Sequence, residues 1–294
     1  MRQLVSLALG SGGARGYAHI GAIEALEKRG YTIQSISGSS MGALVGGFYA
    51  AGSMEEFKHW ALKIDWLSAL KLVDLSLLSS GGAIKGERVF ERLEPFFGSS
   101  AIEKLPIRYT AVATDLDAQK EIWFQEGDLR TAVRASIAIP TVFTPVHHNG
   151  RVLVDGGMLN PLPIAPLMSD HTDLIVAVSV SASQSSPREP FEAEAAKPAA
   201  SVKERAKMWL NNLGIWDAKA EASVTQLDIF QRVIEVMQNV MMLYKIAGYL
   251  PDILVEIPID SCRVYDFHKA KEMIALGYEL TMKAIDKHEA RASR

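Results

Sequence analysis

The segment LVSLALGSGGARGYAHIGAIEALEKRGYTIQSISGSSMGALVGGFYAAG, residues 4–52, carries the pattern that decides the fold. Short apolar runs alternate in it with glycine-rich turns and with stretches that have apolar residues at helical spacing. The predicted elements are a strand over 4–9, a helix over 17–29, a strand over 32–37, a tight turn over 38–42 and a helix over 43–51. Two successive strand–loop–helix units predict an α/β fold.

The rest of the chain extends this pattern. Further strands are predicted over 109–114, 152–154, 174–180 and 253–257, and helices over 201–213, 225–247 and 268–285. We expect a mostly parallel central sheet covered by helices on both faces, with a helical C-terminal portion. The expected division is an α/β core over 1–182, a flexible loop or linker over 183–200, and a C-terminal helical segment over 201–294 whose last strand and helix return to the core.

Composition narrows the functional classes. A net charge of -3 gives nucleic-acid phosphates no reason to bind, so we expect no nucleic-acid partner. Cys262 is the only cysteine, which excludes an intrachain disulfide and fits a reducing compartment. The first apolar run is too short for a signal-peptide core, and no stretch reaches the roughly 18 apolar residues of a membrane span. We therefore expect a cytoplasmic protein whose membrane contact, if any, is peripheral.

Gly38-Ser39-Ser40-Met41-Gly42 is a G-x-S-x-G pentapeptide between a predicted strand and a predicted helix. In that setting it is typical of a nucleophile elbow, a strained turn that needs small flanking residues and projects the serine oxygen above the free N–H groups of the next helix. The pentapeptide alone also occurs by chance in glycine- and serine-rich turns. Its context makes Ser40 the candidate nucleophile.

A second glycine-rich loop, residues 10–16, also lies between a strand and a helix. Its backbone N–H groups can converge on an anion, which suits an oxyanion hole. A phosphate-binding loop is the alternative. Against it, the second strand ends without the acidic residue of a dinucleotide site, and no Gly-Lys-Ser/Thr is present.

Asp155 follows an apolar strand and precedes Gly156-Gly157. Such an aspartate is often only a turn former that caps nearby N–H groups. An α/β-hydrolase would additionally require a histidine and an elbow that follows several strands, whereas Ser40 follows only two.

The combination of these blocks is more specific than any one of them. Gly-Gly-Ala-Arg-Gly, Gly-Ser-Ser-Met-Gly and a later Asp-Gly-Gly, in this order, resemble the three motif blocks of patatin-like phospholipases. The segment that starts at Arg134 also resembles the family's sequence ahead of its aspartate. The resemblance covers roughly residues 4–180, with weaker likeness at 265–280. Ser11 departs from it, since the family usually has glycine there.

The resemblance implies a Ser–Asp dyad without histidine, in which Ser40 is the nucleophile and Asp155 accepts its proton. It also implies that Gly12, Gly13 and Ala14 supply oxyanion N–H groups, while Arg15 braces the loop or meets a lipid phosphate. A carboxylate is a poor base for a hydroxyl in water, so the pair must be partly desolvated. No cofactor is expected, and no cluster of side chains has metal-ligand spacing.

Other candidates are weaker. His147-His148 in a predicted turn could supply a base but is more typical of a surface, and His19 could hold the glycine loop or simply pack in the core. The apolar segment 57–78 fits a lid, a bilayer-contacting patch or a packed helical subdomain. The helix predicted over 225–247 carries one apolar stripe, formed by Leu227, Phe230, Ile234, Met237, Met241 and Tyr244. Its methionine-rich part around Met237, Met241 and Met242 favours core or self-association over a lipid groove, and a homodimer would be reasonable.

The sequence thus predicts a serine acyl hydrolase of the esterase or phospholipase A type, acting on lipid or acyl-ester substrates through an acyl-enzyme. The alternatives are a catalytically silent lipid-binding or regulatory protein with the same fold, and a phosphate-binding α/β module.

Overall fold

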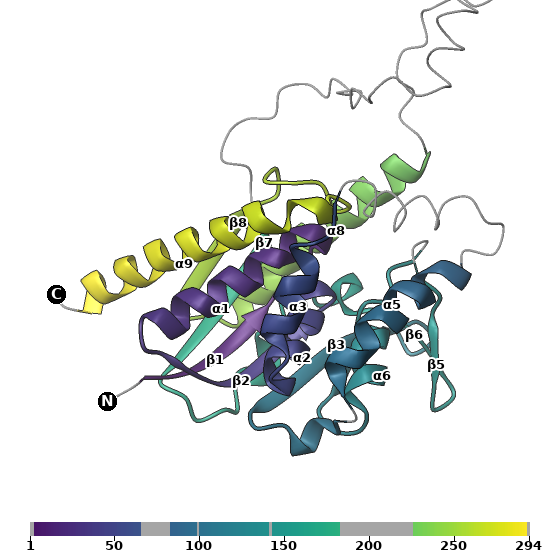
Figure 1. Ribbon diagram of the computed structural model, residues 1–294, viewed down its shortest axis with the longest axis horizontal. Helices are drawn as coiled ribbons and strands as arrows, with labels where there is room; N and C mark the ends of the chain where they lie inside the picture. Colours follow the sequence, from purple (N-terminus) through teal and green to yellow (C-terminus); the bar gives the residue numbers. More distant parts are fainter. Residues whose placement is uncertain (1–2, 66–82, 99, 141–142, 183–225, 293–294) are drawn as a thin grey trace, which may run out of the picture. The chain divides into compact units, whose positions relative to one another are not determined.

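The computed structural model describes most of the chain (Figure 1). The described residues are 3–65, 83–98, 100–140, 143–182 and 226–292. The chain divides into two compact units, Met1–Ser185 with Val236–Arg294, and Ser186–Glu235. Of the second unit, only residues 226–235 are described, as helix. The predicted linker over 183–200 and helix over 201–213 lie outside the described residues.

The described strands form one sheet. They are β1 (Leu4–Leu9), β2 (Thr32–Ser39), β3 (Arg108–Asp115), β4 (Lys120–Phe124), β5 (Val146–His148), β6 (Arg151–Asp155), β7 (Leu174–Ala182) and β8 (Ile253–Pro258). The order is β5-β6-β3-β2-β1-β7-β8, with β4 paired to β3. Strands β3, β2, β1, β7 and β8 are mutually parallel, whereas β4 and β6 run antiparallel to β3. The predicted mostly parallel α/β sheet is confirmed.

Helices and short 3-10 turns connect these strands. The helices are α1 (Ala18–Lys28), α2 (Met41–Ala51), α3 (Met54–Ala61), α5 (Ala83–Phe97), α6 (Leu129–Ser136), α8 (Gln226–Gly248) and α9 (Ala270–Ala292). The 3-10 turns are η1 (Gly13–Tyr17), η2 (Ile102–Lys104), η3 (Gly156–Met158), η4 (Ala165–Leu167) and η5 (Phe267–Lys269). Since β8 pairs with β7 and α9 packs on α1, the end of the chain returns to the sheet.

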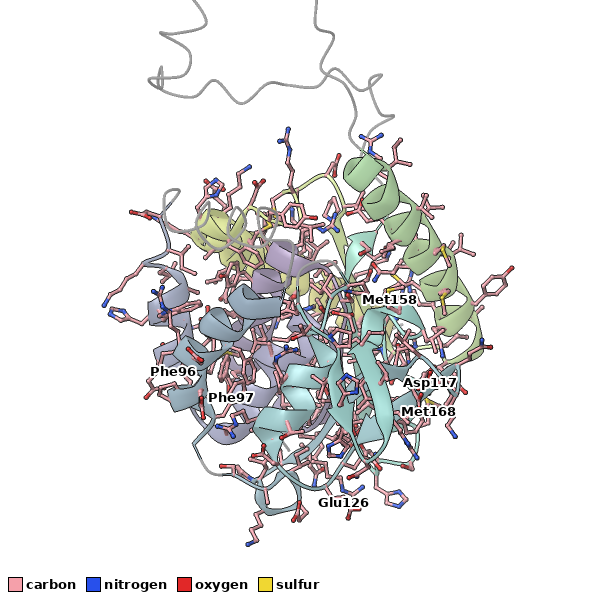
Figure 2. All side chains as sticks on the ribbon, turned by 90° about the vertical axis from the view of Figure 1, so that its right-hand side faces the viewer. Phe96, Phe97, Asp117, Glu126, Met158 and Met168 are labelled. Carbon is pink, nitrogen blue, oxygen red and sulfur yellow. The ribbon has the colours of Figure 1, made fainter. Side chains whose placement is uncertain are left out.

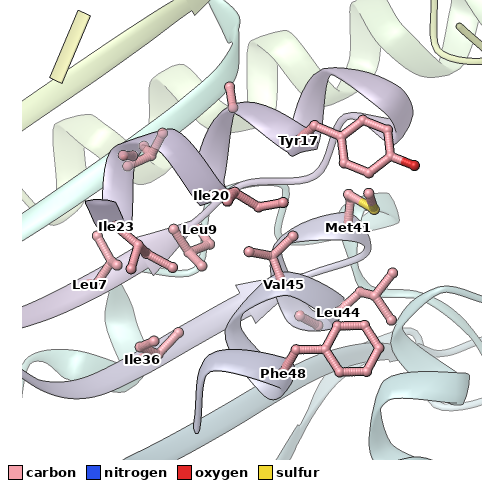
Figure 3. Packing of buried hydrophobic residues seen from close by; sticks show 14 of the residues in the cluster. Leu7, Leu9, Tyr17, Ile20, Ile23, Ile36, Met41, Leu44, Val45 and Phe48 are labelled. Atoms are coloured by element: carbon pink, nitrogen blue, oxygen red, sulfur yellow. The ribbon is translucent and has the colours of Figure 1, made fainter. Parts of the chain in front are cut away.

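The alternation of side chains along each strand builds a core on both faces of the sheet. On β1, Leu7 and Leu9 face the larger core, which α1, α2 and α9 cover. Figure 3 shows Leu9 by Ile20 and Val45, and Leu7 beside Ile23. Ala8 points to the opposite face, into a smaller cluster formed with η4 and α8. Both faces of this central strand are therefore buried.

Two predicted apolar segments have different outcomes. In the segment 57–78, Phe57 of α3 is fully buried and its ring lies 4.5 Å from that of Phe48, while residues 66–82 lie outside the described part. In the helix over 225–247 the methionines divide between the two outcomes that the sequence left open, since Met242 is buried in the core whereas Met237, like Tyr244, is exposed to solvent.

Within the described ranges, we find no helix with the length and hydropathy that a bilayer crossing requires.

Candidate active site

Ser40 lies in a sharp turn between the end of β2 and the start of α2. Its backbone angles, φ 55° and ψ -123°, are unfavourable for a residue with a side chain. The turn is tight because Gly38 and Gly42 lack side chains. A Cβ at Gly38 would lie 2.4 Å from the Ala43 nitrogen, and one at Gly42 would lie 2.1 Å from the Leu9 carbonyl oxygen. This geometry is that of a nucleophile elbow.

A neighbouring helix holds the elbow in place. The Ser40 amide donates to the hydroxyl of Ser136 at 3.0 Å, and that hydroxyl donates to the Val112 carbonyl at 2.6 Å. Ser136 is the last residue of α6 and is completely buried. Its role was not predicted, although it lies in the segment after Arg134 that resembles the family.

Strands β2 and β6 meet end to end along β3. Ser39, the last residue of β2, pairs with Val112, and Asp155, the last residue of β6, pairs with the next residue, Ala113. Strand β4 occupies the other edge of β3 over residues 111–115. Because β2 runs parallel and β6 antiparallel to β3, their carboxyl ends point at one another. This arrangement brings Ser40 and Asp155 together.

Asp155 is buried and held on both sides of its backbone. Its amide donates to the Ala138 carbonyl at 3.0 Å, and the Thr114 hydroxyl donates to its carbonyl at 3.0 Å. The side-chain Oδ1 accepts the Gly157 amide at 2.7 Å. Asp155 thus caps the turn as a turn former would, but this bond uses only one of its two carboxylate oxygens.

The second oxygen of Asp155 remains available. Burial raises the pKa of Asp155 to about 7, while hydrogen bonds from the Ser40 hydroxyl and the Gly157 amide act in the opposite direction. Ser40 is thus close enough to stabilise the carboxylate, yet among the described residues Oδ2 has no partner with the geometry of a formed hydrogen bond. An oxygen in this state can accept a proton from the serine.

The amides of the glycine loop differ in what they contact. Ser11 donates to the Pro161 carbonyl at 2.8 Å, and Ala14 donates to the Val264 carbonyl at 2.9 Å. The Ala14 N–H is thus engaged by a backbone carbonyl and does not face an oxyanion in this conformation. No hydrogen bond from the Gly12 or Gly13 amide occurs within the described residues, so these two N–H groups remain the candidates.

Arg15 and His19 hold this loop from the protein interior. Arg15 is buried and donates to the carbonyls of Gly12, at 3.4 Å, and Ile259, at 2.7 Å. These contacts support the bracing role predicted for Arg15 over contact with a lipid phosphate. Burial lowers the pKa of His19 to about 4, so its ring is neutral at pH 7 and Nε2–H donates to the Gly10 carbonyl at 2.8 Å.

The histidine pair lies elsewhere. His147 and His148 belong to β5, whose register with β6 places Val146 opposite Leu153 and His148 opposite Arg151, further from Asp155. His147 is exposed to solvent. Neither residue is placed to act as the base for Ser40.

Asn160 links the two halves of the site and was not predicted. Its backbone carbonyl accepts a hydrogen bond from the Ser39 hydroxyl at 2.6 Å, and its backbone N–H donates to the Gly156 carbonyl at 2.8 Å. Its side chain donates to Glu121 at 2.8 Å, and Lys245 of α8 binds the other oxygen of that carboxylate. Asn160 therefore ties the residue before Ser40 to the residue after Asp155.

Glu121 stays ionised in this network. Burial alone raises its pKa, but the hydrogen bonds from Lys245, Trp123 and Asn160 outweigh that effect and leave the pKa below its ordinary value. A persistent carboxylate gives Asn160 a strong acceptor, which fixes the orientation of its side chain.

A cavity of about 440 Å³ opens at the other end of the strands, among Ser35, Arg108 and Asp170. Since it lies at the amino end of β3, it does not include Ser40 or Asp155, and we do not assign the substrate to it.

Comparison with known proteins agrees with the motifs. The profile of the family described as Patatin-like phospholipase matches residues 7–168. An uncharacterized NTE family protein of Mycobacterium tuberculosis is 39% identical over 337 residues, which cover 97% of this chain and 92% of that protein. Lysophospholipase nte1 of Emericella nidulans is 32% identical over 184 residues, which cover 60% of this chain and 12% of that protein. Among solved structures, VipD from Legionella pneumophila gives a TM-score of 0.48 at 14% identity, covering 98% of this chain and 67% of that one. The chain therefore belongs to the patatin-like phospholipase family.

Proposed function

We propose that this protein hydrolyses lipid acyl esters through an acyl-enzyme on Ser40, with Asp155 as the base. Family membership and the similarity to lysophospholipases support lipid hydrolase activity in general. The observation that supports the dyad is the convergence of the ends of β2 and β6: Ser40 lies in a strained turn next to the buried Asp155, whose Oδ2 has no hydrogen-bond partner among the described residues.

In the proposed reaction the Ser40 oxygen attacks the ester carbonyl carbon while Asp155 Oδ2 accepts the hydroxyl proton. The negative charge that forms on the carbonyl oxygen is held by the amides of Gly12 and Gly13. When the intermediate collapses, the ester C–O bond breaks and the leaving alcohol takes the proton from Asp155. Water then attacks the carbonyl carbon of the acyl-enzyme and gives a proton to Asp155. When the bond between that carbon and the Ser40 oxygen breaks, Asp155 returns the proton to this oxygen, which releases the fatty acid and restores the Ser40 hydroxyl.

The environment of Asp155 supports this role. An exposed aspartate is too weak a base for a serine hydroxyl. Burial raises the pKa of Asp155 to about 7, which narrows the difference in proton affinity between this carboxylate and the Ser40 oxygen. The carboxylate is then the main form just above neutral pH. Its fixed backbone limits reorganisation during proton transfer.

A fluorophosphonate probe tests the nucleophile. We expect it to label the wild type and to fail on Ser40→Ala. Ser39→Ala is the matched control, because this adjacent serine is also buried but its hydroxyl is occupied by the Asn160 carbonyl. Labelling of Ser40→Ala, or none on a folded wild type, would contradict the proposal, and the second result would favour a lipid-binding protein.

Turnover identifies the substrate class. We expect release of fatty acid from lysophosphatidylcholine and from nitrophenyl esters, with a preference for longer acyl chains, and loss of both activities in Ser40→Ala and Asp155→Asn. A folded wild type that cleaves neither substrate would contradict the assignment.

A further inference from the structure

Helix α8 presents an apolar surface to solvent. From residue 236 to residue 250, every residue exposed to solvent is hydrophobic or glycine. We call its large members, on α8 and on the two residues that follow it, the α8 face, and they are Val236, Met237, Val240, Leu243, Tyr244, Tyr249 and Leu250. Figure 2 shows α8 in pale green at the margin of the core, with side chains that project away from the sheet. A surface helix normally directs its polar side chains to solvent.

The opposite side of the same helix is bound to the core. Met242 is buried against Ala8 and Ala177, and its sulfur contacts the Ser179 hydroxyl at 2.8 Å. Lys245 forms an ion pair with Glu121. The orientation of α8 is thus fixed by specific contacts, and these contacts leave the α8 face outward.

We propose that the α8 face packs against the α8 face of a second copy of this chain, forming a symmetric dimer. Val236, Val240 and Leu243 follow the i, i+4, i+7 spacing with which paired helices interlock, and β-branched residues at such positions favour two-helix association. The large side chains of this face are 38–76% exposed. Together they offer roughly 700 Å² of mostly apolar surface, close to the about 800 Å² that each partner buries in a standard stable interface.

The charges favour a second copy over a lipid surface as the occupant. Helices that lie on anionic bilayers carry several Lys or Arg side chains beside their apolar face. Over residues 236–250 the sequence has one charged side chain, Lys245, and its ammonium group is held by Glu121. An uncharged face is self-complementary, as a two-fold interface requires.

Sedimentation analysis of the full chain from about 1 to about 100 μM tests the proposal. We expect a dimer with a dissociation constant in the micromolar range or below, and a monomer for Leu243→Glu. Leu62→Glu is the matched control, because Leu62, which follows the last residue of α3, is also an exposed leucine, 44% against 62% for Leu243, and its variant should stay dimeric. Both variants should keep wild-type turnover of a soluble ester per subunit.

Crosslinking locates the interface. Val240 lies midway along the part of the α8 face between residues 236 and 244. Val240→Cys should therefore form a disulfide with the same residue of the second copy under mild oxidation, whereas Leu62→Cys should not. Cys262 does not compete, because it is buried and burial raises its pKa to about 11. A wild type that is monomeric throughout the range, or a Leu243→Glu variant that remains a dimer, would overturn the proposal. So would a monomer that binds phosphatidylcholine–phosphatidylglycerol vesicles through Leu243, which would identify the α8 face as a lipid-contacting surface.

Discussion

Replacing Asp155 with asparagine should make the protein more stable while it abolishes turnover. Asparagine keeps an oxygen that can accept the Gly157 amide, so the hydrogen bond of the turn is retained. What it removes is the need to hold a charge in a buried position. The folded pKa is about 7 against an ordinary 3.8, a difference of about three pH units, and each unit corresponds to 1.36 kcal/mol. Where the carboxylate is ionised in both states, Asp155→Asn should therefore be more stable to unfolding than the wild type by about 4 kcal/mol.

The sign follows from proton binding. Below about pH 4 the carboxyl is protonated in both folded and unfolded chains, and its contribution to stability is fully present. Between pH 4 and pH 7 the unfolded chain releases the proton while folded Asp155 keeps it, so the wild type loses about 1.4 kcal/mol per pH unit relative to Asp155→Asn. Above about pH 8 the difference is constant.

Urea denaturation of both proteins at pH 5, 6, 7 and 8 measures this difference, and all other titrating groups cancel in it. We expect the stability advantage of Asp155→Asn to grow by about 2.5 kcal/mol from pH 5 to pH 8, with no detectable turnover. Parallel stability curves for the two proteins would refute the reasoning, because they would mean that Asp155 ionises in the folded state as it does in water.

The remaining predictions concern the pH profile and the residues that hold the site. kcat/KM should rise with pH to a plateau, with an apparent pKa of about 7, because Asp155 must be ionised to accept the proton; an acid limb near pH 4 would contradict this. Ser136→Ala should lower kcat about tenfold with little change in KM and cost about 1–2 kcal/mol in urea, since the Ser40 amide loses its acceptor. Asn160→Ala should cost about 1–3 kcal/mol, because Glu121 loses a donor, and a neutral result would show that the bond is dispensable. The pKa of folded His19 is about 4, so the wild type loses stability as the pH falls below the ordinary histidine pKa, because the unfolded chain then binds a proton that the folded chain does not. Between pH 7 and pH 5 the free energy of unfolding of the wild type should therefore fall by about 2 kcal/mol more than that of His19→Gln.

Local sequence patterns were sufficient for the elements that carry the site. The apolar run of β1, the glycine turn and the small-residue helix α2 are each decided by neighbouring residues, so their types and approximate bounds were predictable. Strands β4 and β5 were not predicted, because they are short and owe their conformation to pairing with β3 and β6.

Tertiary structure decided which chemical groups are available. Ala14 and Gly13 look equivalent in the sequence, but only in the fold does the Val264 carbonyl occupy the Ala14 amide. Asn160 carries no local signal, since its partners Ser39 and Glu121 are far away along the chain.

The outward face of α8 shows most clearly what the sequence determines and what only the tertiary structure determines. The helix itself was predictable from its periodic apolar residues. Because α8 carries apolar side chains on more than one of its sides, this periodicity did not decide which side packs on the sheet. That choice depended on Met242 fitting the cluster beneath it and on Lys245 reaching Glu121. A sequence by itself determines where hydrophobic side chains occur along a helix, whereas their burial depends on which surfaces the rest of the fold brings against it.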